Sequence, residues 1–410
     1  MTARPEDRGP ATGASTPEDP WRALAPRVLA VLARRSGDFG AAEDAVQEAL
    51  VAAATTWPER GTPDNPVGWL ITVASRRLAD RSRSDRARRR REDTAARSEE
   101  PGVRPAAGDD SLTVILMCCH DALSPAAAIP LTLRAVGGLT TREIAAAFLL
   151  PEATTAQRIS RAKARIAETG ATFDLPPPDR LPARLRTACH VLYLIYNEGY
   201  ASTAGAELSR PDLSAEAIRL ARMLHSAAPA DPEVTGLLAL MLLTDARRPA
   251  RTGPAGELVP LAEQDRSLWD HALITEGLRL ATEALGHGAM GEYQALASIA
   301  ALHDEAASHA STDWRRILAL YRVLERITDN PIVTLNRAVA TGMADGPAAG
   351  LAVLEGLDAR LGDHHRLHAV RAHLLELAGR PAAAEFRLAA ARATNERERD
   401  YLIMKAASAR

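Results

Sequence analysis

The sequence predicts an all-α protein with more than one domain. Hydrophobic residues make up 46% of the 410 residues but aromatic residues only 4%, while Ala, Leu, Glu and Arg recur throughout. These four residue types have high helix propensity. Apolar residues recur at spacings of three and four, which is the period of an amphipathic helix. The chain also exceeds the usual length of one domain, so we expect two or three.

Two stretches interrupt the helical pattern and divide the chain. Residues 93–110 are acidic and contain two prolines and two glycines, and residues 171–182 contain three consecutive prolines. Both compositions are typical of linkers. We therefore predict a first module over residues 21–92, a second module over residues 111–170 and a C-terminal extension over residues 183–410.

The start of the chain shows no membrane or export signal. Residues 1–20 are rich in Pro, Gly, Thr and charge and lack the apolar core of a secretory signal, so we expect a disordered lead-in. The longest nearly unbroken apolar run, Leu237 to Leu243, is far shorter than the roughly 20 residues that cross a bilayer. The protein is therefore expected in the cytoplasm, with no membrane partner.

The first module contains a helix with a buried face and a polar stripe. In AAEDAVQEALVAAATTW, helical spacing predicts one core face: Val46, Leu50, Ala53 and Trp57. The opposite stripe is acidic and polar with one apolar member: Asp44, Gln47, Glu48 and Val51. Periodicity alone leaves two interpretations open, an ordinary solvated face and a protein-binding surface.

A loop rich in Pro and Gly follows and leads into a basic helix that begins near Pro66. From Arg76 to Glu92 there are nine Arg against three acidic residues, a local net charge of +6. Such density attracts phosphate regardless of sequence. One interpretation is an ordinary solvated helix. Because Trp69 lies beside the loop, the second interpretation is a surface for single-stranded nucleic acid, in which a flipped base lodges in the loop while Arg76 and Arg77 hold the backbone of the strand.

In the second module, LTTREIAAAFLLPEATTAQRISRAKARI predicts a helix-turn-helix. Thr140 stands three residues before Glu143, a capping box that opens a short helix through Phe148. A turn at residues 149–151 leads to a helix whose predicted outward face is polar and basic: Thr154, Gln157, Arg158, Arg161 and Arg165. The second helix of this motif enters the major groove, where Arg reads guanine and Gln reads adenine. A helical hairpin with a solvated basic face is the alternative.

Together these segments resemble the extracytoplasmic-function (ECF) type of the sigma-70 family of RNA polymerase sigma factors. DFGAAEDAVQEAL followed by NPVGWLITVASRRLADR resembles region 2, and the helix-turn-helix resembles region 4. The order also matches, with an acidic linker between the regions. The resemblance implies an initiation factor that binds core RNA polymerase and promoter DNA, is not an enzyme and uses no cofactor.

The resemblance assigns a role to each surface. Core polymerase would be contacted by the stripe of Asp44, Gln47, Glu48 and Val51. The minus-10 element would be melted and read by Asn65, Trp69, Thr72, Arg76 and Arg77. The minus-35 element would be read by Thr154, Thr155, Gln157, Arg158, Arg161, Lys163 and Arg165. Relatives often have Asn at the position of Arg76, which leaves the preferred base open.

The extension is predicted to form consecutive helical hairpins. Asp231-Pro232-Glu233 and Asp329-Asn330-Pro331 are helix starts, with an N-cap followed by proline. Helices expected to end at Gly342 and Gly379 recur near the 34-residue tetratricopeptide period. RLRTACHVLYLIYNEGY and TDWRRILALYRVL resemble an ECF subgroup with a fused tetratricopeptide-like domain. That resemblance implies regulation in cis and a protein or small-molecule partner of the extension.

Other candidate sites favour structural roles. Several polar residues of the extension lie beside apolar ones and could form either a ligand or partner pocket or helix caps and inter-helix hydrogen bonds. We favour the structural role for this set: Asn197, Glu198, Gln264, Asp265, Arg266 and Asp270. Cys118, Cys119 and Cys189 lack metal-site spacing and are expected as buried thiols. His364, His365 and His368 are expected on the surface, without a metal.

Two other functions compete with a sigma factor. One is a helix-turn-helix transcriptional regulator that acts on duplex DNA, and the other is a helical-repeat scaffold or sensor. The stripe on the first helix and the Trp69 loop separate these alternatives, because a regulator of duplex DNA needs neither. No catalytic triad, phosphate-binding Gly loop or catalytic carboxylate pair emerges from the sequence, so an enzyme is the weakest alternative.

Overall fold

Helices account for the architecture, as predicted. The computed structural model describes residues 24–92, 110–286 and 289–409, except the side chains of residues 81–92. Within these ranges there is no strand, and the β-pairing consists of two isolated bridges. No helix in the described part of the chain is long and apolar enough to cross a membrane. The predicted lead-in over residues 1–20 and most of the acidic linker lie outside the residues that the structure describes.

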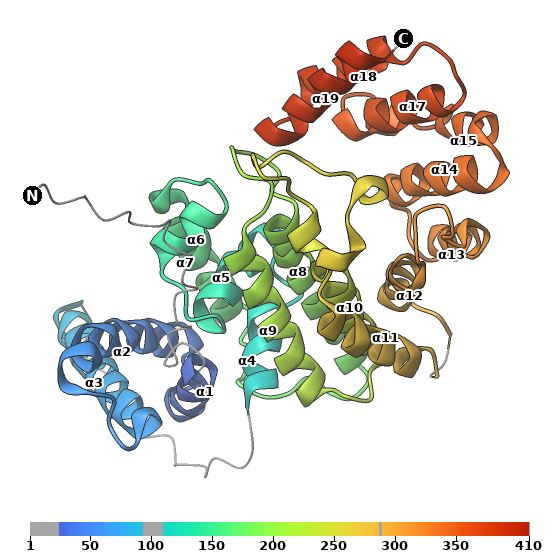
Figure 1. Ribbon diagram of the computed structural model, residues 1–410. Coiled ribbons are helices and arrows are strands. Elements are labelled where there is room, and N and C mark those ends of the chain that lie inside the picture. Colours follow the sequence, from blue (N-terminus) through green and yellow to red (C-terminus); the bar gives the residue numbers. More distant parts are fainter. Residues whose placement is uncertain (1–23, 93–109, 287–288, 410) are drawn as a thin grey trace, which may run out of the picture.

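The first module is a three-helix unit (Figure 1). Its helices are α1 (Ala25–Ser36), α2 (Phe39–Arg60) and α3 (Pro66–Glu92). Gly37 ends α1 with a left-handed φ of 69°, and Asp38 caps α2 by accepting a hydrogen bond from the Ala41 amide. The predicted core face of α2 is confirmed, since Val46, Leu50, Ala53 and Trp57 are all buried.

The second module has four short helices. They are α4 (Ser111–Cys118), α5 (Pro125–Ala135), α6 (Thr141–Ala147) and α7 (Glu152–Glu168). The predicted capping box is confirmed, because the Thr140 hydroxyl accepts from the Glu143 amide and the Glu143 carboxylate accepts from the Thr140 amide. Leu149 turns the chain between α6 and α7 with a left-handed φ of 52°. The helix-turn-helix is thus formed where the sequence predicts it.

The extension is a curved stack of helices. Its α-helices are α8 (Leu181–Tyr200), α9 (Pro211–Ala227), α10 (Pro232–Asp245), α11 (His271–Leu285), α12 (Glu292–Glu305), α13 (Trp314–Ile327), α14 (Pro331–Asp345), α15 (Pro347–Leu354), α16 (Asp358–Leu361), α17 (His365–Leu377), α18 (Ala383–Arg392) and α19 (Glu396–Ser408). Three 3-10 helices, η2 (Arg248–Ala250), η3 (Leu261–Glu263) and η4 (Arg266–Leu268), interrupt the loop between α10 and α11. Most of these helices pack on their neighbours in sequence, as a helical-repeat arrangement requires.

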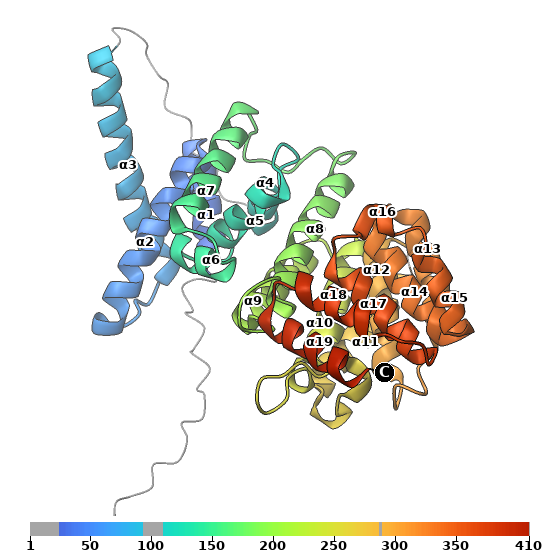
Figure 2. The same ribbon diagram turned by 90° about the horizontal axis from the view of Figure 1, so that it is seen from above.

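The far end of the stack returns to its beginning (Figure 2). The loop between α8 and α9 is held by the residues between α18 and α19. The Asn395 side chain donates to the Glu207 carbonyl at 2.8 Å, and the Thr394 hydroxyl donates to the Thr203 carbonyl. Gly205 and Asn395 also form a parallel β-bridge. The stack is therefore closed by contacts between segments almost 200 residues apart in sequence.

The predicted helix boundaries are mostly right, with one error. Asp231 and Asn330 are N-caps, and Gly379 follows the end of α17 with a φ of 65°. The prediction that a helix ends at Gly342 is wrong, because α14 continues to Asp345. A Cβ on the neighbouring Gly350 would lie 3.0 Å from Gly342 Cα. Gly342 therefore serves a close approach of α14 and α15, not a helix end.

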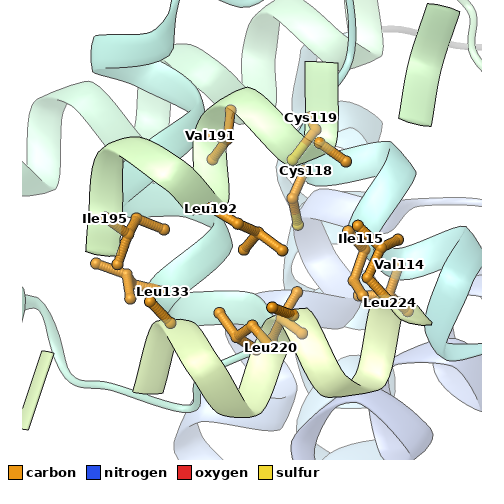
Figure 3. Packing of buried hydrophobic residues seen from close by; sticks show 14 of the residues in the cluster. Val114, Ile115, Cys118, Cys119, Leu133, Val191, Leu192, Ile195, Leu220 and Leu224 are labelled. Atoms are coloured by element: carbon orange, nitrogen blue, oxygen red, sulfur yellow. The ribbon is translucent and has the colours of Figure 1, made fainter. Parts of the chain in front are cut away.

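One hydrophobic core runs through the first module, the second module and the first part of the extension, and Figure 3 shows where the last two meet. From the second module, Val114, Ile115, Cys118, Cys119 and Leu133 point into it; from the extension come Val191, Leu192, Ile195, Leu220 and Leu224. The helices in contact are α4 with α8 and α9, and α5 with α8. The Pro-rich segment thus connects two parts that fold against each other.

This shared core generates a stability prediction. Leu220→Ala, at a fully buried position on α9, should lower the free energy of unfolding by about 2–5 kcal/mol and speed amide hydrogen exchange in α4 and α5. Denaturant unfolding and hydrogen exchange measure the two effects. Leu285→Ala is the control, because Leu285 is 47% exposed. Unchanged exchange in α4 and α5 would contradict a common core.

Candidate polymerase and promoter interface

The stripe on α2 is partly exposed and partly covered. The Val51 side chain is 57% exposed, and the side chains of Glu48 and Asp44 are 40% and 33% exposed. Gln47 is buried, and its amide donates to the Arg134 carbonyl of α5 at 2.7 Å. The stripe therefore continues from open surface at Val51 into a contact with the second module at Gln47.

A buried carboxylate lies beside the covered end of the stripe. Glu43 accepts from Arg134 Nε at 2.8 Å and from Lys163 Nζ at 3.0 Å, and its side chain has no exposure. Lys163 Nζ also lies 2.6 Å from Asp44. We call Glu43, Asp44, Gln47, Arg134 and Lys163 the Glu43 cluster. It joins α2 to both α5 and α7.

The Glu43 cluster was not predicted, although the sequence holds a signal for it. Glu43 precedes Val46 by three residues and Leu50 by seven, which places a carboxylate on the apolar face of α2. A buried charge needs a partner, so this position implied a cation from another helix. Nothing local in the sequence indicated which cation.

The predicted minus-10 residues gather at the start of α3. Asn65 caps the helix by accepting from the Gly68 amide at 2.9 Å, and the Thr72 hydroxyl donates to the Gly68 carbonyl at 2.8 Å. The Trp69 ring is half-buried against Trp57, edge to face, with the ring centroids 5.4 Å apart. The first turn of α3 therefore places an aromatic ring, packed against Trp57 of α2, beside an exposed helix face.

Arg76 and Arg77 continue this face and are both exposed. Arg77 Nε lies 3.5 Å from the Glu48 carboxylate. The residues predicted to contact the minus-10 element and those predicted to contact polymerase therefore meet between α2 and α3. A surface hollow at this point is lined by stripe residues, Arg77, Arg134 and Thr140. The remaining arginines of the predicted basic run belong to residues 81–92, whose side chains the structure does not describe.

The predicted minus-35 residues divide into two groups. Five lie on the solvent side of α7 and are exposed or half-buried: Thr154, Gln157, Arg158, Arg161 and Arg165. Thr155 is buried, with its hydroxyl donated to the Pro151 carbonyl at 3.3 Å. Lys163 faces α2 in the Glu43 cluster. In this arrangement neither Thr155 nor Lys163 is available to DNA, because helical spacing turns both toward protein.

A second contact joins the first module to both ends of the second. The Arg34 guanidinium on α1 donates to the Asp110 carboxylate at 2.7 and 3.1 Å, and it lies 5.6 Å from the centre of the Phe173 ring. The Asp110 carboxylate raises the pKa of Arg34 above its usual value. The chain thus enters and leaves the second module beside α1.

The polar residues of the extension that could have formed a ligand pocket have structural roles, as the sequence analysis favoured. Asp270 caps α11, Gln264 accepts from the Trp269 indole at 3.3 Å, and Arg266 donates to the carbonyls of His303 and Ala306 at 2.7 Å. Glu198 accepts from Ser202 and Thr203, Asp265 caps η4, and Asn197 hydrogen-bonds Tyr193. These contacts satisfy helix ends and hold loops.

The cysteines and histidines also have structural surroundings. All three cysteines are buried and unpaired with one another, as predicted. His368 is buried between Glu385 at 2.7 Å and the Gly362 carbonyl at 3.0 Å, so its predicted surface position is wrong. His364 caps α17, and His365 contacts Glu398. Among the described residues, no group of three or more His, Cys, Asp or Glu is placed to hold a metal ion.

Comparison with known proteins gives each part of the chain a family. The model of sigma-70 region 2 matches residues 21–89, and that of sigma-70 region 4 matches residues 113–166. A family of unknown function, DUF6596, matches residues 184–285. No solved structure matches the chain. The tetratricopeptide likeness and the module boundaries therefore stay predictions.

Two relatives show how far the likeness extends. An uncharacterized protein of Rhizobium meliloti (strain 1021) is 40% identical over 398 residues, which is 93% of this chain and 92% of that protein. The probable ECF RNA polymerase sigma factor SigI of Mycobacterium tuberculosis is 31% identical over 169 residues, 38% of this chain and 56% of that protein. With regions 2 and 4 in order and a helical C-terminal domain, the chain belongs to the sigma-70 family, as a factor of the ECF type.

Proposed function

We propose that this sigma factor binds core RNA polymerase through α2, recognises the minus-35 and minus-10 promoter elements through α7 and α3, and initiates transcription. The observation that carries the proposal is the division of α2 into a buried face and a stripe that is accessible at Glu48 and Val51, followed in sequence by a helix-turn-helix. A protein that works on core polymerase acts in the cytoplasm.

The accessible part of the α2 stripe has the chemistry of a protein-binding surface. Val51 is a large apolar side chain that is 57% exposed, and the Glu48 carboxylate lies one turn before it. Apolar anchors beside charged groups are typical of interface centres, where the charges provide orientation and specificity. A regulator that only reads duplex DNA has no need of this stripe.

The promoter-facing surfaces differ in kind, and each suits its proposed target. The outward face of α7 presents a row of Gln157, Arg158, Arg161 and Arg165, which suits the base edges and phosphates of a duplex. The start of α3 presents the fixed Trp69 ring beside Arg76, which suits an unpaired base and its backbone.

The extension would regulate in cis by fixing the second module. On α9, Arg219 donates to the Val136 carbonyl at 3.2 Å, and just before α9 Arg210 donates to the Ala146 carbonyl at 2.8 Å. The Val136 carbonyl lies at the end of α5, and the Ala146 carbonyl lies in the last turn of α6, the first helix of the helix-turn-helix. We propose that the extension supports transcription by holding α6 and α7 in place. A protein or small-molecule partner of the extension would act through the same contacts.

Run-off transcription with purified core polymerase and genomic templates tests the whole proposal. We expect specific transcripts that appear only when the protein is added, and their start sites identify the promoter elements. Duplex binding without polymerase, together with no transcript, would instead favour a helix-turn-helix regulator.

The polymerase contact can be tested by charge reversal. Glu48→Lys should weaken core-polymerase binding roughly tenfold or more, because it places a cation on a surface that offers an acid. The free energy of unfolding should change by no more than about 0.5 kcal/mol, as is usual at an accessible position. Glu59→Lys is the matched control, an exposed residue of the same helix with the same charge change. Equal binding by both variants would refute the contact.

The minus-35 contact can be tested on α7. Arg161→Ala should weaken promoter binding by about 1–3 kcal/mol and relax preference at one position if the side chain reads a base. If it holds a phosphate, all sequences should weaken alike and the salt dependence should fall. Run-off assays on promoter variants measure both. Arg380→Ala removes an exposed arginine from the extension and should change neither.

The role of the extension can be tested without truncating the shared core. Arg210→Ala combined with Arg219→Ala should weaken its attachment to the second module by about 1–3 kcal/mol for each hydrogen bond lost. We expect faster hydrogen exchange in α6 and a several-fold drop in transcript yield. Arg279→Ala, in an exposed pair on α11, is the control. Full transcript yield despite faster exchange would refute regulation through these contacts.

A further inference from the structure

An open groove runs between α18 and α19, the helix pair at the edge of the stack (Figure 1). Its volume is about 530 Å³. Spacings of three and four bring one stripe of each helix into the groove. Its lining is Arg387, Ala390 and Ala391 from α18, and Arg399, Ile403, Ala406 and Ala407 from α19. The groove thus combines small apolar side chains with one arginine from each helix.

The apolar side chains at this groove are accessible to solvent. The Ile403 side chain is 53% exposed, and its neighbour Met404 is 58% exposed. Leu402, in contrast, is buried in the same hydrophobic cluster as Phe386 of α18. The helix α19 therefore uses one face to hold α18 and leaves a second apolar face open. Large apolar side chains that gather on a surface in this way mark interaction sites.

The two arginines of the groove are charges that a bound molecule must match. Within the part of the chain that the structure describes, neither Arg387 nor Arg399 forms an ion pair. Lys405 on α19, by comparison, holds the Glu376 carboxylate at 2.7 Å. No carboxylate of the described residues lines the groove. Its charge is therefore complementary to that of an acidic partner.

We propose that this α18–α19 groove docks an amphipathic helix of a partner protein. The apolar stripe of that helix lies on Ile403 and the alanines, and its flanking carboxylates pair with Arg387 and Arg399. The inference rests on the function proposed above only in giving the extension a partner. It adds the place and the chemistry of the contact, and its test needs neither polymerase nor promoter DNA.

A helix suits this groove better than an extended peptide does. The alanines of the groove are small, so a third helix can approach to the distance of about 8–10 Å that is usual between packed helices. Extended peptides commonly bind by pairing with the edge of a sheet, and the described residues form no strand. Helix-in-groove docking is therefore the recognition mode that this surface supports.

A second copy of this chain suits the groove less well. In a symmetric dimer the same patch faces itself, so the arginines at positions 387 and 399 of both copies would come together. Like charges that meet at an interface oppose association. The acidic helix is therefore favoured, and self-association is an outcome that the test has to detect.

Two synthetic helical peptides test the proposal on the full-length protein. Both carry the same stripe of leucine and alanine at spacings of three and four, flanked by glutamates in one peptide and by lysines in the other. We expect the glutamate peptide to bind about tenfold or more tightly, because only its side chains pair with the two arginines. Fluorescence anisotropy measures both affinities. Added salt should narrow the difference, since it screens accessible charges.

A charge swap identifies the groove as the binding site. Arg387→Glu combined with Arg399→Glu should reverse the order of the two peptides, because the groove then repels glutamate and attracts lysine. The matched control is Arg315→Glu combined with Arg326→Glu, which changes the net charge equally at two exposed arginines of α13. This control should leave the order of the peptides unchanged.

The apolar part of the contact needs its own variant. Ile403→Asp should weaken both peptides about tenfold or more, because it places a carboxylate against their apolar stripe. Leu285→Asp changes another large apolar residue that is 47% exposed, at the end of α11, and should weaken neither peptide. Circular dichroism should show equal helix content in all variants. If Ile403→Asp loses helix content, the charge swap alone decides the site.

The outcomes that overturn the proposal are distinct. Failure of both peptides to bind, or equal binding of the two by the unmodified protein, would contradict an acidic helix as the occupant. Binding that survives both the charge swap and a folded Ile403→Asp would lie elsewhere on the protein. A dimer in sedimentation that Ile403→Asp abolishes would make the occupant a second copy. Absence of transcripts in the run-off assay would refute the proposed function but would leave peptide binding unchanged.

Discussion

The arrangement of the DNA-reading modules depends on one carboxylate without access to water. Glu43 lies among apolar residues of α2, and its charge is balanced by Arg134 from α5 and Lys163 from α7. A carboxylate in this position is tolerable only while both cations stay near it. This requirement links helices that the sequence separates by about 90 and 120 residues, and it acts together with the hydrophobic cluster that regions 2 and 4 share.

The extension imposes a second constraint. Buried residues of regions 2 and 4 and of the first part of the extension form one continuous hydrophobic cluster, and helices of region 4 contact α1 and α2 on one side and α8 and α9 on the other. The side of region 2 also carries the buried ion pairs of Glu43. The orientation of the helix-turn-helix therefore depends on both neighbours.

Local patterns predicted the helices well and the contacts between modules poorly. The α2 core face, the capping box at Thr140 and the N-caps at Asp231 and Asn330 depend on residues within one or two turns, so spacing alone identifies them. The error at Gly342 has a non-local cause, since this glycine makes room for α15. The positions of Lys163 and His368 were also missed for non-local reasons, because their partners lie on other helices. The roles proposed for α2, α3 and α7 came from resemblance and stay predictions.

The bridge between Gly205 and Asn395 has a consequence for biosynthesis. An open helical stack can complete each hairpin as it leaves the ribosome, because every unit contacts only its neighbours. Here the loop after α8 lacks the hydrogen bonds from Thr394 and Asn395 until these residues have been translated. At typical rates of about 5–20 residues per second, that interval lasts on the order of ten seconds or more. During it, Ser202 and Glu207 have backbone carbonyls still hydrated by water. The stack can therefore close only after α18 and the residues that lead into α19 have been translated.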